Sequence, residues 1–287
     1  MSPSSENSAN SIKFQPLADP VILEPILAQR LPISCNVYNI MKLNSTWQND
    51  IKWFTLQDPN VHDVWIAATY FRKDLGRVIC ISRPPTAQNS PEVRHAFLTC
   101  DFIDWDESFL FTAVDTTVSS LVADISIIDK GNWTQVHPND LYLISREDAA
   151  NLKIETGEFE LKPINNKEGV DFIGTNWKYA NENTPDYVEK SLSRGISSGV
   201  YINGKIVAGA LVTPDGLTGM LYCLKEFRGK GYGRIVMNQV MKEGAESQHI
   251  PCCCVEVRNE VSKAFQVKIG FKLAARVNYV KYVKSTY

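Results

Sequence analysis

Two kinds of apolar segment follow one another along the whole chain. Short apolar runs bounded by turn residues predict strands, and apolar residues that recur every three or four positions predict helices. The predicted strands are 36–44, 63–71, 77–83, 93–102, 157–163, 197–202, 205–213, 217–224, 251–257 and 271–284. The predicted helices are 21–30, 113–127, a short one from Ser145, 167–178, one opening at Thr184, 231–247 and 260–269. This interchange predicts an α/β or α+β architecture.

Local signals support several of these elements. Ser145 and Asp148 stand in capping-box positions, which predicts that a short helix begins there. Thr184 is expected to cap the next helix, with Pro185 in its first turn. Asn203-Gly204 lies between two predicted strands, and this dipeptide predicts a tight hairpin turn.

A polar stretch at 153–169 suggests a boundary between two domains. A chain of 287 residues exceeds one average domain and is short for three. We therefore expect a first domain over 1–155, whose residues 1–11 form a disordered tail, and a second domain over 156–287.

The composition is that of a globular protein with a real core, with 44% hydrophobic and 22% charged residues. The 30 cationic and 32 anionic residues nearly balance, which argues against a nucleic-acid partner. No apolar run approaches the ~20 residues that span a bilayer, so no membrane association is expected. The amino-terminal residues lack the apolar core of a secretion signal and the arginines of a mitochondrial presequence, and we expect a cytoplasmic protein.

The stretch "LYCLKEFRGKGYGRIVMNQVMKEG", residues 221–244, runs from a predicted strand through a basic, glycine-rich turn into a helix. It does not fit a dinucleotide fingerprint, because Arg234 stands where glycine is needed. It does not fit a nucleoside-triphosphate loop either, because Gly231 follows Lys230. The pattern that does fit this turn is Arg228-x-x-Gly231-x-Gly233. Glycines, free helix N–H groups and cations together favour a diphosphate ligand. The alternative is a surface turn with solvated cations.

The order of elements around this turn resembles the GNAT superfamily of acetyl-coenzyme A-dependent N-acyltransferases. More narrowly, "LKEFRGKG", "NWKYANENTPDYVEKSL", "GVYINGKIVAG" and "NEVSKAF" are similar to segments of the glycine N-acyltransferase-like family. In the first half, "LPISCNVYNIMKLN" and "DVWIAATYF" resemble that family's amino-terminal region. The resemblance implies tandem GNAT-like domains, each a twisted mixed sheet flanked by helices, of which the first is degenerate and the second binds acyl-coenzyme A.

The implied reaction moves an acyl group from acetyl-coenzyme A, or another acyl-coenzyme A, to the amino group of a small molecule such as glycine or another amino acid. The resemblance also leaves a mitochondrial location open. The implied contacts of the coenzyme are strand backbone, the glycine-rich turn and a helix start: Cys223, Leu224, Lys225, Arg228, Gly229, Lys230, Gly231, Tyr232, Gly233, Arg234 and Asn259. Asn259 is equally well explained as a helix cap.

The catalytic base is where the chain departs from its relatives. Glycine N-acyltransferases are thought to use a glutamate at the position of Leu217, which cannot take a proton. Glu256 is one candidate base, since a carboxylate buried in "CCCVEV" would have a raised pKa. Asp215 is the other, if the strand entry bends inward. The tyrosine acid of many relatives corresponds to Gln266 here, and we regard Tyr279 and Tyr282 as distant substitutes.

Cys252, Cys253 and Cys254 are predicted to be core residues. Successive strand residues point to opposite faces, so the three thiols cannot converge on one ion, and no metal is expected. Trp177 and Tyr179 are candidates to line the acceptor pocket, with a core role as the alternative.

Three other functions stay open. The first is a protein or arylalkylamine N-acetyltransferase, and the second is a non-catalytic acyl-coenzyme A-binding protein, suggested by Leu217 and Gln266. The third treats the glycine-rich turn as purely structural. Acyl length, acceptor identity and oligomeric state are not predicted.

Overall fold

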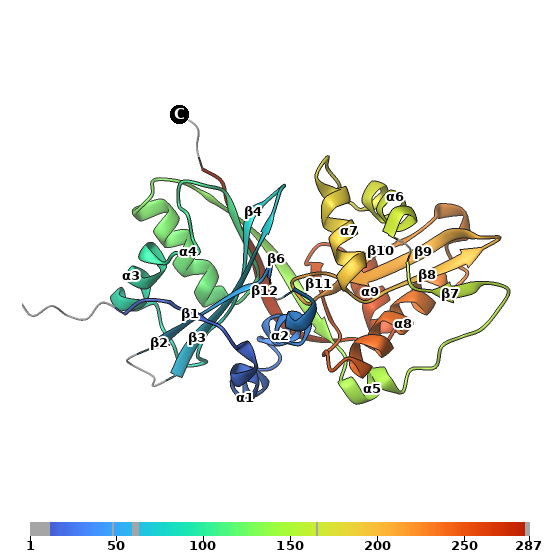
Figure 1. The fold of residues 1–287 in the computed structure, drawn as a ribbon, viewed down its shortest axis with the longest axis horizontal. Helices are drawn as coiled ribbons and strands as arrows, with labels where there is room; N and C mark the ends of the chain where they lie inside the picture. The colour runs from blue at the N-terminus through green and yellow to red at the C-terminus, as the bar shows by residue number, and fades with distance from the viewer. Residues whose placement is uncertain (1–11, 48, 59–62, 165, 285–287) are drawn as a thin grey trace, which may run out of the picture.

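Two sheets form the framework of the computed structural model, which describes residues 12–47, 49–58, 63–164 and 166–284 (Figure 1). The predicted tail 1–11 lies outside these ranges. The larger sheet has the strand order β1-β2-β3-β4-β5-β12-β6-β11, and the smaller has the order β10-β9-β8-β7. Helices α3 and α4 cover the outer face of the larger sheet, whereas α6 and α7 lie on one face of the smaller sheet and α8 and α9 on the other (Figure 1).

The strands are β1 (Gln15–Leu17), β2 (Lys52–Asp58), β3 (Asp63–Arg72), β4 (Gly76–Ser82), β5 (Phe109–Val114), β6 (Thr134–Leu143), β7 (Glu160–Lys162), β8 (Ser197–Ile202), β9 (Lys205–Val212), β10 (Thr218–Cys223), β11 (Cys252–Glu256) and β12 (Lys272–Tyr282). The α-helices are α1 (Glu24–Gln29), α2 (Cys35–Trp47), α3 (Pro91–Thr99), α4 (Thr116–Ile128), α5 (Arg146–Ala150), α6 (Asn166–Asn176), α7 (Thr184–Arg194), α8 (Tyr232–Glu246) and α9 (Glu260–Lys268). Two 3₁₀ turns, η1 (Pro20–Leu23) and η2 (Lys225–Phe227), complete the described elements.

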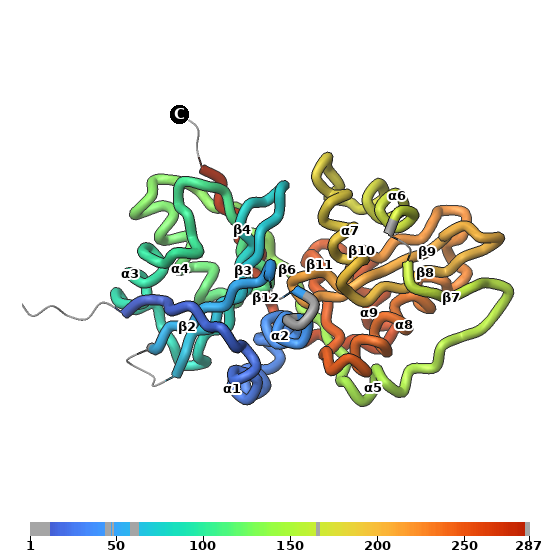
Figure 2. The backbone as a smooth tube through the Cα atoms, viewed as in Figure 1, coloured from blue at the N-terminus to red at the C-terminus, as the bar shows by residue number. Residues whose placement is uncertain are grey.

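The same succession of elements occurs twice. A strand, two helices and three strands are followed by helix, strand, helix and strand: first from β1 to β6, then from β7 to β12. The segment that joins the two halves runs from α5 along the outside of the second half to β7 (Figure 2). The chain is therefore a structural duplication, although the sequence shows no repeat.

The two halves exchange their last strands. Strand β12, from the second half, lies between β5 and β6 of the first, and β6 lies between β12 and β11 of the second. Tyr282 at the end of β12 stacks on Phe109 with ring centroids 4.6 Å apart, and its hydroxyl donates to the Trp105 carbonyl at 2.8 Å. The sheets consequently do not part at residue 155, and the division into 1–155 and 156–287 stays a prediction.

Two predicted strands are helices. Segment 36–44 belongs to α2, whose residues Val37, Tyr38, Ile40 and Met41 are all buried. A helix that is buried on most sides reads as a continuous apolar run, and such a run cannot be told from a strand by its period. Segment 93–102 begins in α3.

The start signal of α3 lies before the predicted strand. Ser90 caps α3 by accepting a hydrogen bond from the Val93 amide, and Pro91 occupies its first turn. The buried residues Val93, Ala96 and Phe97 have helical spacing, which confirms that the period was misread.

Most other predicted elements are confirmed. Ser145 caps α5, and Asn203 and Gly204 form the predicted hairpin turn with φ of 50° and 75°. Thr184 is not the cap of α7. The cap position is Asn183, and the Thr184 hydroxyl instead accepts from the Asn181 amide at 2.8 Å.

The strand exchange predicts that the two fragments will stay associated when the joining segment is cut. We expect a protease site inserted between Gly157 and Glu158 to be cut without loss of structure, because these residues are exposed and β6 and β12 hold the fragments together. Size-exclusion chromatography should show both fragments eluting together at the position of the uncut chain. Elution as two separate folded species would contradict the exchange.

Candidate functional site

Strands β10 and β11 are the facing edges of the two sheets. Strand β10 pairs with β9 in the smaller sheet and β11 pairs with β6 in the larger one, and among the described strands no ladder joins β10 to β11. The chain passes from β10 to β11 through residues 224–231 and α8. An opening between strand edges leaves backbone groups available to a ligand that adds as a strand.

Strand β10 is irregular beside this opening. Its pairing with β9 shifts between Gly219 and Tyr222, and Met220 has a φ of 53°. Such a bulge turns one peptide group out of the ladder and bends the strand. Positive φ at a residue with a side chain is uncommon and concentrates at functional positions.

The glycine-rich turn has an open backbone. Gly229 and Gly231 have φ of 78° and 86°, and Gly231 is the residue before α8. A Cβ at Gly229 would meet no atom within 4 Å. In this described segment, the backbone N–H groups of residues 229–233 have no intrachain acceptor. Free amides at a helix start, with space above them, fit an anionic diphosphate.

The cations of the turn differ in their surroundings. Arg228 donates from Nε to the Cys223 carbonyl at 3.0 Å and lies over the Tyr222 ring, so it also holds the end of β10. Lys230 lies over the Phe227 ring. Arg234 is bound by both oxygens of Glu155, at 2.7 and 2.8 Å. Sequence reasoning missed this partner, because Glu155 lies in the joining segment.

Two further predicted contacts have intrachain roles. The Leu224 amide donates to the Val207 carbonyl at 2.9 Å, so this N–H faces β9 and not the opening. The Asn259 side chain accepts from the Ser262 amide at 3.1 Å and caps α9. The cap reading of Asn259 is therefore confirmed, and its contact with a coenzyme stays a prediction.

Asp215 is buried at the entry to β10, with 7% of its surface exposed. Its turn is held by α2 of the first half, where Asn39 donates to the Gly216 carbonyl at 2.8 Å. Gly216 has a φ of 74°, and a Cβ there would lie 2.7 Å from the Asn36 carbonyl oxygen. The inward bend that the prediction required is thus present.

The Thr213 hydroxyl contacts both the Asp215 carboxyl and the Leu217 carbonyl, the latter at 2.9 Å. One hydroxyl proton serves one acceptor, so both contacts are satisfied together when Asp215 carries a proton. Burial raises the pKa of the Asp215 carboxyl, against smaller lowering by the Thr213 hydrogen bond and the Arg72 charge.

Residues from both halves surround Asp215. Tyr187 of α7 lies near Tyr70 of β3 and near Thr213, and burial raises its pKa well above the ordinary value of a phenol. Tyr279 of β12 is half-buried, and its pKa is raised by loss of contact with water and by the nearby Cys254 and Asp215. Tyr279 was predicted to be distant, and the strand exchange brings it to this cluster. No sequence signal links these positions, since only the topology makes them neighbours.

Glu256 lacks the burial on which its prediction rested. Its side chain is 37% exposed, and both carboxylate oxygens bind Lys178, at 2.9 and 2.8 Å. Leu217 is buried, and Gln266 is buried with its Oε1 unpartnered. Tyr282 lies in the core of the first half. Of the two carboxylates, Asp215 is the buried one, and its pKa is raised.

The remaining predicted residues lie as follows. Cys252 and Cys253 are buried, Cys254 is half-buried, and no metal-binding cluster occurs in the described ranges. Trp177 packs on Tyr179 and Tyr187 with centroids 5.4 and 6.4 Å apart, which places it at the edge of the Asp215 cluster. Tyr179 is half-exposed.

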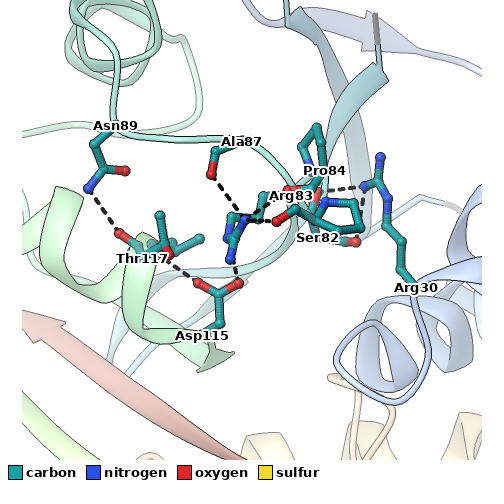
Figure 3. A network of polar contacts seen from close by, with 10 residues as sticks. Arg30, Ser82, Arg83, Pro84, Ala87, Asn89, Asp115 and Thr117 are labelled. Atoms are coloured by element: carbon teal, nitrogen blue, oxygen red, sulfur yellow. Dashed lines mark hydrogen bonds and ion pairs between the residues drawn. The ribbon is translucent and has the colours of Figure 1, made fainter. Parts of the chain in front are cut away.

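Residues 83–90 form the corresponding turn of the first half, and this turn has the same length. The side chain of Arg83, which belongs to the turn, fills it (Figure 3). Arg83 binds Asp115 at 2.7 Å and donates to the carbonyls of Pro84, Pro85 and Ala87 at 2.8 to 3.1 Å. Strand β4 also pairs directly with β5 in parallel. The first half therefore has neither the parted strands nor the open turn.

Residues 193–280 match a family model described as FR47-like protein. A Drosophila protein of known crystal structure is similar at 18% identity, with a TM-score of 0.80 over 96% of this chain and 100% of that one. A tandem GNAT protein from the clavulanic acid biosynthesis pathway is similar at 10% identity, with a TM-score of 0.54 over 96% and 99%. A GCN5-related N-acetyltransferase from Sphaerobacter thermophilus is similar at 9% identity, with a TM-score of 0.52 over 97% and 98%.

These likenesses show that the chain has the GNAT fold in tandem, as the sequence predicted. No curated protein sequence matches the chain significantly. Within the described ranges, none of the helices combines the length and apolarity needed to cross a bilayer.

The open turn predicts a specific effect of Gly231→Ala. Its left-handed φ makes a side chain unfavourable, and we expect a loss of about 1 kcal/mol of stability together with weaker binding of coenzyme A. Gly204→Ala is the matched control, since Gly204 has a φ of 75° with nothing within 4 Å of its Cβ. Thermal unfolding should show similar losses for both variants, and titration calorimetry should show weaker binding for Gly231→Ala alone.

Proposed function

We propose that the chain is an acyl-coenzyme A-dependent N-acyltransferase that acts on the amino group of a small molecule. The observation that carries the proposal is the opening between β10 and β11, which ends at a turn whose amides at 229–233 are free. Both features lie in the half that matches the family model. Membership of the glycine N-acyltransferase-like family, binding of acyl-coenzyme A and a cytoplasmic location are part of the proposal.

The residues around the opening suit a coenzyme A thioester. The free amides and Lys230 would hold the diphosphate, and Arg228 would add charge while it orients the end of β10. The peptide groups of Cys223 would face the acyl-bearing arm, because alternate strand residues face opposite edges and Leu224 faces β9. Arg234 becomes available to a phosphate only when it leaves Glu155.

Asp215 would take the proton that the amine loses. In the reaction the amine nitrogen bonds to the acyl carbon, the carbon–sulfur bond breaks, and the thiolate leaves. A thiol has a pKa near ~8.5, so the thiolate is a tolerable leaving group without an acid. Tyr279, whose pKa burial raises, is a phenol that could return a proton.

The acceptor is a primary amine in each version of the proposal. The sequence resemblance suggests glycine or another amino acid, and an arylalkylamine is the alternative within enzymes. A non-catalytic acyl-coenzyme A-binding protein is the second candidate, favoured by Leu217 and Gln266 at the positions of the family's base and acid. Release of coenzyme A thiol from acetyl-coenzyme A on addition of any amine would decide against it.

The first test concerns the coenzyme. We expect Arg228→Ala and Lys230→Ala each to weaken binding of coenzyme A by roughly 10- to 100-fold, since a charge-assisted hydrogen bond contributes about 1.5–3 kcal/mol. Lys52→Ala, on β2 of the first half, is the control and should bind normally. Titration calorimetry should give one site per chain, because Arg83 fills the turn of the first half. Unchanged affinity in both loop variants would falsify the assignment.

The second test separates the two candidate bases. We expect Asp215→Asn to lower kcat by about 10²- to 10⁴-fold, the usual contribution of a general base, whereas Glu256→Gln should retain activity. In the parent enzyme, kcat/KM should fall as the pH drops through the raised pKa of Asp215. An inactive Glu256→Gln beside an active Asp215→Asn would reverse the assignment.

The variant Asp215→Asn should lose activity but should not lose stability. The raised pKa means that the native state binds more protons than the unfolded chain between the two pKa values of Asp215, so native stability falls as the pH rises through that window. Asp215→Asn cannot ionise and should be at least as stable as the parent above the window. Urea unfolding at several pH values measures this.

A further inference from the structure

A second buried carboxylate lies near Asp215 and is already neutralised. Asp74, just after β3, binds Arg72 through two hydrogen bonds, from Nε at 3.0 Å and from a terminal nitrogen at 2.6 Å. The side chains of Arg72 and Asp74 are only 9% and 6% exposed. Asp74 also accepts from the Asn181 amide group at 3.1 Å.

The ring of Tyr187 lies between the Arg72–Asp74 pair and the surroundings of Asp215. The Arg72 guanidinium lies 3.8 Å from the centroid of Tyr187 and 5.8 Å from that of Trp177. Tyr187 lies near Thr213, whose hydroxyl contacts Asp215. The Arg72 charge also lowers the pKa of Asp215, so the two groups share one electrostatic environment.

Three cations of this region have carboxylate partners. Every Lys and Arg of the chain lies in the described ranges. Lys73 binds Asp186 and Lys178 binds Glu256, as Arg72 binds Asp74. Asp215 is therefore the charge without an ion-pair partner here, and the cluster presents one negative charge when Asp215 is ionised.

We infer that the acceptor is a primary amine without a carboxylate, carried on an apolar or aromatic group, and not an α-amino acid; this inference rests on the proposed function. An arriving ammonium neutralises Asp215 and passes it a proton. The ring of Trp177, which is only half-buried, suits a cation or an aromatic group. An amino acid would bring a further carboxylate into a buried site where Asp74 already occupies the buried cation Arg72, and burial of an unpaired charge is costly.

Asp74 is the selectivity residue in this arrangement. It occupies the guanidinium fork of Arg72, which is the group best shaped to bind an acceptor carboxylate. Removing the Asp74 charge would release Arg72 for that purpose. Asp74 touches neither Asp215 nor the glycine-rich turn, so its effect is on which acceptor is used and not on the coenzyme.

The test compares three acceptors of one size class, with acetyl-coenzyme A and thiol release as the readout. The acceptors are 2-phenylethylamine, L-phenylalanine and L-phenylalaninamide, of which the amide keeps the bulk of the amino acid and lacks its charge. We expect kcat/KM to favour the amine over phenylalanine by about 100-fold or more, because a site rejects a substrate that leaves buried polar groups unmatched. Phenylalaninamide should behave like the amine.

The variant Asp74→Asn should narrow the gap between phenylalanine and the amine by about 10-fold or more, with the affinity for coenzyme A unchanged. Phenylalanine turned over as fast as the amine by the parent enzyme would overturn the inference and leave the proposed function standing. Binding of coenzyme A with no thiol release for any of the three would overturn both. The comparison with phenylalaninamide stands on the parent enzyme alone, so a poorly folded variant does not remove the test.

Discussion

The exchange of β6 and β12 is the constraint on which the rest of the molecule depends. Because β12 lies between β5 and β6, and β6 extends the same sheet to β11, the large sheet ends at β11. Strand β10 then belongs to a different sheet, and the opening beside the glycine-rich turn follows from this assignment of edges. The same exchange carries Tyr279 to the Asp215 cluster, while α2 and β3 of the first half supply the other walls.

The two halves share one fold but differ in whether the turn before the third helix is open. The turns 83–90 and 224–231 have equal length and connect equivalent elements, but their free polar groups differ. In the first half, the Arg83 guanidinium binds the carbonyls of its own turn (Figure 3). In the second, glycines leave backbone N–H groups exposed to an outside anion. The second half therefore has an open turn, whereas the Arg83 side chain closes the equivalent turn of the first half.

The sequence predicted correctly the features that depend on residues close together in the chain. The glycine-rich turn, the Asn203-Gly204 hairpin and the strands of the second half depend on backbone preferences that neighbouring residues reveal, and the structure confirms their positions. Helices α2 and α3 were mistaken for strands, because α2 is buried on nearly every side and the cap of α3 lies outside the segment considered. Glu256 was expected to be buried, yet it ends its strand at the surface beside Lys178. Contacts such as Arg72 with Tyr187, or Glu155 with Arg234, join residues about 80 to 115 positions apart, and no local pattern encodes them.

The carboxyl of Asp215 is buried at the entry to β10. The turn that holds it is fixed by Asn39 and by the close approach of Gly216 to α2, and neither contact uses the Asp215 carboxyl. Ionising that group away from water opposes folding, and the Thr213 hydrogen bond with the Arg72 charge offsets only part of the effect. Arg72 nevertheless forms its ion pair with Asp74 and not with Asp215, although Asp215 lies in the same environment. The carboxyl of Asp215, which has no ion-pair partner, keeps a raised pKa, and this is the property that the proposed role as a base requires.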